Sequence, residues 1–320
     1  MIEIVLFVIG LVVLIKGADF LVEGSSTLAK KLGIAPMIIG LTIVAIGTSL
    51  PELLVNVFAA ISHQPEIALG NIIGSNIANI LLILGITVIV ARTITLKHTT
   101  IWREIPFAIG AIILLLILAV ISPAHIINRT GGILLLLAFV VFIYYIYRYA
   151  MQSKNTEEYL TEVEKIPIQT YSPIKITALI LFGLIGLYFG GKWTVEGAIY
   201  IATVLGLSEF VISATIIAIG TSLPELVTSL IAIRKNEKDL AIGNIIGSNI
   251  VNILLILGIT ATITPLPVLN YMFIDLVVVM TITALLFAFM FIGKKHELER
   301  WQGIVFIILY VAYIGLIILR

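Results

Sequence analysis

Long apolar runs separated by short polar stretches dominate the chain. A helix needs about 20 mostly apolar residues to cross a bilayer, and in lipid a spanning segment must satisfy its own backbone hydrogen bonds. The pattern therefore predicts an all-α membrane protein with ten transmembrane helices. These lie near 3–25, 36–61, 67–91, 105–121, 131–149, 174–198, 209–233, 240–263, 271–292 and 301–319.

Two motifs occur twice inside these runs. The letters AIGTSLPEL stand at 45–53 and again at 218–226, and GNIIGSN stands at 70–76 and again at 243–249. The offset is 173 residues in both cases. The pattern predicts two copies of one unit, with motif regions at 45–87 and 218–260.

The copies are expected to face opposite ways in the membrane. Equivalent positions are five crossings apart, and five is odd, so the second copy enters from the other face. Such inverted-topology repeats are typical of secondary transporters that alternate access around a central site. We expect a first five-helix repeat at 1–150, a linker at 151–172 and a second, inverted five-helix repeat at 173–320.

Basic residues indicate the orientation. The loops on the side away from the N-terminus carry nearly all the loop Lys and Arg, whereas the other side has only Arg129, Lys192 and Arg320. The positive-inside rule makes the basic side cytoplasmic. The pattern predicts a multi-pass protein of the cell membrane with both termini extracellular and the 151–172 linker cytoplasmic.

Composition narrows the function. Of 320 residues, 60% are hydrophobic and 12% are charged, against roughly 25% charged residues in soluble domains. A net charge of +1 gives no reason to expect a nucleic-acid partner, and the absence of cysteine excludes disulfides and thiolate chemistry. The four histidines fall in loops, so no buried Ser–His pair can form. We expect a transporter in the lipid bilayer, not an enzyme, with no cofactor.

The first motif places oxygen atoms near the middle of a helix. Thr48 and Glu52 share a face, with Ser49 beside them. Pro51 has no N–H for the carbonyl of Gly47, so backbone oxygen atoms are released there. The second copy repeats this set with Thr221, Ser222 and Glu225. Carboxylate, hydroxyl and carbonyl oxygens are ligands of hard cations.

The second motif adds neutral polar side chains. Asn71, Ser75 and Asn79 fall at four-residue intervals and predict one polar stripe. The second copy has Asn244, Ser248 and Asn252. The glycine pairs 70/74 and 243/247 predict close helix packing. We expect these four segments to bring neutral oxygens and two carboxylates to one depth in the membrane.

Structural roles compete with these interpretations. Ser, Thr and Asn in membrane helices often make only interhelical hydrogen bonds. Charged residues near helix ends are expected to pair at the interface; these are Lys16, Asp19, Glu23, Lys192, Glu196 and Asp275. A glutamate at the membrane centre costs about 3 kcal/mol or more and marks ion or proton pathways. Two at equivalent positions favour a cation site.

The paired motifs resemble the two α-repeats of the sodium/calcium exchanger family, within the cation/Ca²⁺ exchanger superfamily. The resemblance covers nearly the whole chain and is greatest to the small prokaryotic members. It implies ten helices and exchange of Na⁺ against Ca²⁺, typically three for one. We expect a monomer as the functional unit; the sequence does not give the oligomeric state. The cycle would be electrogenic.

The resemblance also implies roles for individual residues. Glu52 and Glu225 would be the carboxylates shared by Ca²⁺ and Na⁺. Backbone carbonyls would come from Ala45, Thr48, Ala218 and Thr221. Flanking Na⁺ ligands would be Ser49, Ser75, Ser222 and Ser248, and Asn79 would line the middle of the site.

One position departs from part of that family. Some prokaryotic members and the potassium-dependent branch carry aspartate where this chain has Asn252. Both polar stripes here end in asparagine, which leaves two central carboxylates and argues against potassium co-transport by that branch's mechanism.

Two other functions stay open. A proton/calcium antiporter could use the same glutamates, because burial raises the pKa of a carboxyl group; the hydroxyl and carbonyl ligands favour Na⁺. A cation channel is the second alternative, but channels usually place ligands around an axis between subunits, whereas this chain repeats its motifs within itself.

Overall fold

The computed structural model describes residues 2–122, 125–153, 171–206 and 220–319. In these ranges eight helices are long and apolar enough to cross a membrane, or nine spans if a helix pair broken near Ser49 counts as one. The prediction of a helical membrane protein is confirmed. The expected segment 209–233 is described only from residue 220 onward, so the count of ten stays a prediction.

Two compact units divide the chain, and each takes part of both sequence halves. The first comprises Met1–Thr48 and Val141–Gly247. Its helices are α1 (Ile2–Leu32), α2 (Pro36–Ile39), the π-helix η1 (Gly40–Val44), α3 (Ala45–Thr48), α10 (Pro173–Val204), α13 (Leu223–Arg234) and most of α14 (Lys238–Val251), with the end of α8 (Arg129–Ser153).

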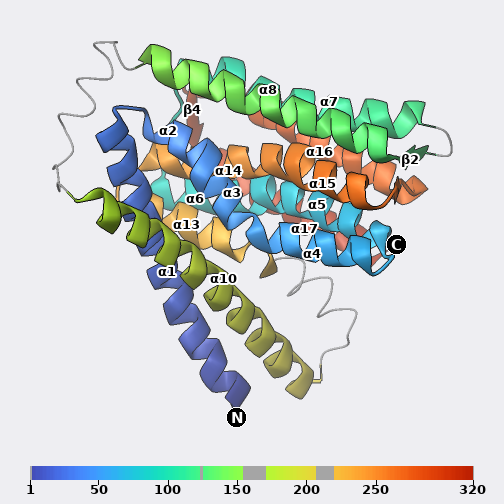
Figure 1. Cartoon of the computed structure of the whole chain (residues 1–320), viewed down its shortest axis with the longest axis horizontal. Helices are drawn as coiled ribbons and strands as arrows, with labels where there is room; N and C mark the ends of the chain where they lie inside the picture. Colours follow the sequence, from blue (N-terminus) through green and yellow to red (C-terminus); the bar gives the residue numbers. More distant parts are fainter. Residues whose placement is uncertain (1, 123–124, 154–170, 207–219, 320) are drawn as a thin grey trace. The chain divides into compact units, whose positions relative to one another are not determined.

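Helices α1 and α10 lie side by side in this unit (Figure 1). Glycines allow the close approach: a Cβ on Gly190 would lie 2.4 Å from the backbone nitrogen of Leu14, and one on Gly183 would lie 2.6 Å from that of Leu21. In lipid, helix association depends on van der Waals contact of this kind, because the surroundings are as apolar as the side chains. Backbone packing therefore holds this pair together.

The second unit comprises Ser49–Val140 and Ser248–Arg320. Its elements are α4 (Leu50–Ile61), α5 (Pro65–Ile77), η2 (Ala78–Ile83), α6 (Leu84–Ala91), β1 (Thr93–Thr95), η3 (Thr100–Glu104), α7 (Ile105–Ile121), β2 (Ile126–Ile127), the start of α8, η6 (Asn252–Ile256), α15 (Leu257–Ile263), β3 (Leu266–Pro267), α16 (Asn270–Phe289), β4 (Glu297–Glu299) and α17 (Arg300–Ile318).

Two short antiparallel ladders in this unit have no counterpart in the apolar pattern. β1 pairs with β4, so that Ile94 lies opposite Leu298, and β2 pairs with β3, so that Ile127 lies opposite Leu266. Each ladder joins two connections between helices, and its backbone groups satisfy one another where no helix does so. Strands of two or three residues are too short to produce a recognisable alternation of apolar and polar residues.

The helix break at the Pro-Glu motif is confirmed. Helix α3 ends at Thr48 and α4 begins at Leu50, with Ser49 between them at φ −83° and ψ 10°. In the second copy α13 likewise begins at Leu223, after Ser222 at φ −90° and ψ 5°; the chain before residue 220 lies outside the described residues, so a break in that helix stays a prediction. Proline lacks an N–H and crowds the preceding turn, so it is tolerated in the first turn of a helix, where no partner for that N–H is needed.

The glycine prediction is confirmed in the second copy. A Cβ on Gly243 would lie 2.6 Å from the Met37 carbonyl oxygen, and one on Gly247 would lie 2.8 Å from the Leu41 Cα. No described atom lies within 4 Å of a Cβ built on Gly70 or Gly74. In the second copy these glycines pack against residues 37–45. The positions equivalent to 37–45 are 210–218, and all of them lie outside the described residues. Close packing of the glycines in the first copy therefore stays a prediction.

Candidate functional site

In each unit, one of the two motif glutamates is buried in the first turn of a helix. Glu52 lies in the first turn of α4 and is 1% exposed, and Glu225 lies in the first turn of α13 and is 0% exposed. A helix N-terminus carries partial positive charge and favours a carboxylate in its ionised form. The N-termini of α4 and α13 would thus help to stabilise a negative charge on either side chain in apolar surroundings.

Asn244 organises the polar side chains of the first unit. Its Nδ2 lies 3.1 Å from the Ser229 Oγ and 3.4 Å from the Glu225 carbonyl oxygen, to which it donates. Its Oδ1 accepts from the Thr48 hydroxyl at 3.0 Å. The same hydroxyl lies 3.3 Å from the Ala45 carbonyl oxygen. One buried amide therefore ties α3, α13 and α14 together beside Glu225.

The other predicted residues of the first unit are placed as follows. Ser222 is buried as the residue before α13. Thr221 is partly buried, and its hydroxyl oxygen has no hydrogen-bond partner among the described residues. Ala45 is fully buried at the start of α3. Ala218 lies outside the described residues.

The second unit gathers the remaining predicted residues on buried helix faces. Helix α4, which carries Glu52, packs against α5, η6 and α15. Ser49, Ser75, Asn79, Ser248 and Asn252 are all at most 2% exposed. Within the described part of the chain, the Ser75 hydroxyl and both polar atoms of the Asn79 amide have no hydrogen-bond partner. Buried polar atoms normally have partners, so these are candidates for contact with a bound ion or its water.

Both polar stripes end in a π-helical turn. Asn79 is the second residue of η2, and Asn252 is the first residue of η6. Single π turns inside α-helices occur frequently at functional sites. The extra residue in the turn shifts the direction of these two side chains relative to a regular helix.

One interhelical hydrogen bond repeats in both copies and was not expected from the sequence as part of the site. Asn71 donates to the Asn56 Oδ1 at 2.9 Å, and the equivalent Asn244 donates to the Ser229 Oγ at 3.1 Å. Residues 56 and 229 are also equivalent under the 173-residue offset. The sequence does contain a signal for this hydrogen bond, because a polar residue, Asn56 or Ser229, stands one helical turn after each glutamate.

These donor sets suit a hard cation. Hydroxyl, amide and carboxylate oxygens are typical of Ca²⁺ coordination. In the described residues no group of three or more His, Cys, Asp and Glu side chains is arranged to hold a metal ion. The candidate ligands beside Glu52 and Glu225 are therefore mostly neutral oxygens.

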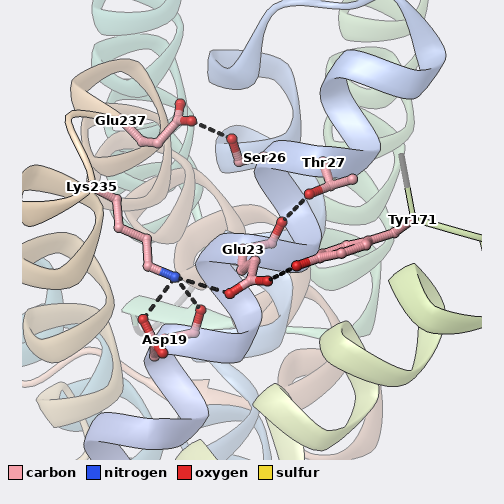
Figure 2. A network of polar contacts seen from close by, with 7 residues as sticks. All are labelled: Asp19, Glu23, Ser26, Thr27, Tyr171, Lys235 and Glu237. Atoms are coloured by element: carbon pink, nitrogen blue, oxygen red, sulfur yellow. Dashed lines mark hydrogen bonds and ion pairs between the residues drawn. The ribbon is translucent and has the colours of Figure 1, made fainter. Parts of the chain in front are cut away.

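A separate charged cluster surrounds Lys235 in the first unit (Figure 2). The Lys235 Nζ lies 2.7 Å from the Asp19 Oδ1 and 3.4 Å from the Glu23 Oε2. Nearby, Ser26 donates a hydrogen bond to Glu237. The paired side chains are about one-third exposed, so each ion pair contributes at most about 1 kcal/mol. The expected pairing of Asp19 and Glu23 is confirmed, but α1 continues to Leu32, so neither residue lies at a helix end.

Tyr171 joins this cluster from the chain just before α10. Its hydroxyl donates to the Glu23 Oε1 at 2.7 Å. This hydrogen bond raises the pKa of the Tyr171 phenol, because the neutral phenol is the donor and the carboxylate opposes a second negative charge. At neutral pH the phenol is therefore protonated and can act as the donor.

Comparisons with known proteins agree with this architecture. The family model described as "Sodium/calcium exchanger protein" matches residues 2–148 and 175–319. The sodium/calcium exchanger MaX1 of Methanosarcina acetivorans is 32% identical over 98% of this chain and 97% of its own. The inner membrane protein YrbG of Escherichia coli is 38% identical over 81% of this chain and 79% of its own.

A solved structure shows the same fold. It is that of the sodium-calcium exchanger NCX_Mj soaked with 2.5 mM Na⁺ and 0.1 mM Ca²⁺. It aligns with a TM-score of 0.81 and 32% sequence identity, over 98% of each chain. Both the sequence and the fold thus match across nearly the whole chain.

Proposed function

Because the chain belongs to the sodium/calcium exchanger family, we propose that it is an antiporter that exchanges Na⁺ for Ca²⁺ by alternating access. The observation that carries this proposal is the pair of buried glutamates, Glu52 and Glu225, in the first turns of the equivalent helices α4 and α13. Buried carboxylates in membrane helices mark ion pathways. The exchanger relatives indicate that the ions on this pathway are Na⁺ and Ca²⁺.

The ligands follow from the two motifs. Glu52 and Glu225 bind the transported cation. Carbonyl or hydroxyl oxygens near them come from Ala45, Thr48, Ala218, Thr221, Ser49 and Ser222. The polar stripes add Ser75, Asn79, Ser248 and Asn252. The neutral oxygens support Na⁺ as the counter-ion, because a carrier of protons would need only the carboxylates.

Charge explains why exchange prevails over leak. Two ionised glutamates carry −2, which one Ca²⁺ neutralises, whereas three Na⁺ leave +1. Both loaded forms are close to neutral, but the empty site at −2 is costly to move through apolar surroundings. Only loaded forms cross, and a three-for-one cycle moves one net charge.

The topology forms part of the same proposal. Ten helices form two inverted five-helix repeats, 1–150 and 173–320, in the cell membrane. Both termini face outward and the 151–172 linker is cytoplasmic. The supporting observations are the 173-residue offset, the matching helix starts at Leu50 and Leu223, and the concentration of loop Lys and Arg on one side.

The counter-ion can be tested with purified protein in liposomes. Vesicles loaded with Na⁺ and diluted into Na⁺-free buffer should take up ⁴⁵Ca²⁺, whereas Na⁺-free vesicles with an acidic interior should not. Positive charge leaves as Ca²⁺ enters in this direction, so an inside-positive potential should accelerate uptake and an inside-negative potential should slow it. Equal uptake in Na⁺-free acidic vesicles would instead establish proton/calcium antiport, and tracer entry with no counter-ion would indicate a channel.

A further inference from the structure

Asn76 and its equivalent in the second copy, Asn249, contact each other directly in the second unit. The Asn76 Nδ2 donates to the Asn249 backbone carbonyl at 3.2 Å. The other end of the same amide, the Asn76 Oδ1, accepts from the Asn252 Nδ2 at 3.0 Å. These side chains are at most 5% exposed. Asn76 therefore connects the backbone of α14 to the amide that ends the second polar stripe.

This chain of hydrogen bonds fixes the direction of the Asn252 amide. Its nitrogen is used by Asn76, so its Oδ1 points elsewhere, and that oxygen is buried without a hydrogen-bond partner in the described ranges. A buried acceptor left in this way costs free energy unless a donor or a cation meets it. Asn252 thus presents an oxygen atom, not an N–H group.

The equivalent amide in the first stripe, that of Asn79, is not held by hydrogen bonds in this way. Asn79 is 1% exposed, and neither its Oδ1 nor its Nδ2 has a hydrogen-bond partner among the described residues. The two stripes have nearly the same sequence, yet only one has its amide held. The asymmetry lies in the hydrogen bonds, not in the residue types.

Asn76 also discriminates between asparagine and aspartate at position 252. An aspartate there has no N–H to donate, so its oxygens would face the Asn76 Oδ1. Turning the Asn76 amide over would relieve that repulsion but would break the bond to the Asn249 carbonyl. A fixed acceptor at Asn76 therefore favours an amide as its neighbour.

We infer that Asn76 is a positioning residue that holds the Asn252 side chain with its oxygen available to the transported cation, and that it makes position 252 selective for asparagine. The inference rests on the proposed function, because it assigns the acceptor to a cation. Asn76 acts through Asn252 and is not itself a ligand. Asn79 has no such support and can orient its amide to suit the ion that is bound.

A double-mutant cycle tests this coupling. In Ca²⁺ transport by proteoliposomes, Asn76→Ala and Asn252→Ala should each raise the KM for Ca²⁺ on the order of tenfold, with little change in maximal rate. The double variant should be no worse than the more affected single variant, because both remove the same oriented oxygen. Effects that multiply to about 100-fold would overturn the inference. If Asn76→Ala does not fold, Asn76→Ser replaces it with the same expectations.

The equivalent pair provides a matched control. For Asn249→Ala and Asn79→Ala the effects on the KM should multiply, since the Asn79 amide has no described hydrogen bond to lose. Asn252→Asp should raise the KM in the wild-type background but add no further effect to Asn76→Ala. Equal coupling in both pairs, or an Asn252→Asp effect independent of Asn76, would contradict the assignment.

Ca²⁺ binding separates this inference from the proposed function. In Na⁺-free detergent solution, Ca²⁺ should raise the melting temperature of Asn76→Ala and of Asn252→Ala by less than it raises that of the wild type. If the wild-type protein proves to exchange protons instead of Na⁺, the proposed counter-ion is wrong, but the cycle measured on Ca²⁺ binding still tests Asn76. Unchanged Ca²⁺ binding in Asn76→Ala and Asn252→Ala would overturn the positioning role even if Na⁺ exchange is established.

Discussion

Glu52→Gln and Glu225→Gln should each lower Na⁺-driven Ca²⁺ uptake by about 100-fold or more, which corresponds to about 2.7 kcal/mol. Each substitution keeps the shape of the side chain but removes one of the two negative charges that the proposed function assigns to cation binding. A single carboxylate leaves bound Ca²⁺ with an uncompensated charge in buried surroundings, where charge is most costly. Initial rates of ⁴⁵Ca²⁺ uptake into Na⁺-loaded proteoliposomes measure the effect.

Stability distinguishes this loss of function from misfolding. Both glutamates are at most 1% exposed, so replacing a buried charge with an amide should leave the melting temperature without ions unchanged or higher. The Ca²⁺-induced rise in melting temperature should disappear. Glu66→Gln, at an exposed position in the first turn of α5, is the matched control and should transport normally. Substantial Ca²⁺ uptake by either buried variant would refute the ligand assignment.

Gly190→Val should strongly destabilise the protein. A Cβ at this position would lie 2.4 Å from the backbone nitrogen and 2.7 Å from the Cα of Leu14 on α1. Backbone atoms cannot rotate away as a flexible side chain can, so α1 and α10 would have to separate along a contact made largely by glycines. Overpacking of this kind costs about 1–3 kcal/mol, occasionally more, and a lower melting temperature in detergent should report it.

Gly315→Ala provides the control for the helical glycines. No described atom lies within 4 Å of a Cβ built on Gly315 in α17, so this substitution should leave the melting temperature unchanged or raise it slightly through better helix propensity. Equal stability of Gly190→Val and the wild type would show that α1 and α10 do not pack as described.

Much of the local structure follows from the sequence because its causes are local. Pro51 and Pro224 lack an N–H, and in both copies a helix begins at the residue before the proline, Leu50 or Leu223. The ion pairs of Asp19 and Glu23 could also be expected, because charged residues in apolar helices need partners.

The hydrogen-bond partners of the site could not be predicted in the same way. Four-residue spacing selected Asn71, Ser75 and Asn79 as one stripe and passed over Asn76, which lies on another helix face. Its importance comes from contacts with α14 and η6, distant in sequence. The π turns after both stripes also have no signal in the residue pattern, since π-helical and α-helical segments share the same apolar composition.

Simultaneous counting of both ions tests the central claim most directly. Proteoliposomes loaded with ²²Na⁺ and supplied with external ⁴⁵Ca²⁺ report the two fluxes from one sample, with the potential clamped by K⁺ and valinomycin. If the empty site at −2 cannot cross, ²²Na⁺ should leave only when an exchangeable cation is outside, at about three Na⁺ for each Ca²⁺ that enters. Calcium entry with no accompanying ²²Na⁺ release, or a ratio that drifts freely with the ion gradients, would contradict the account.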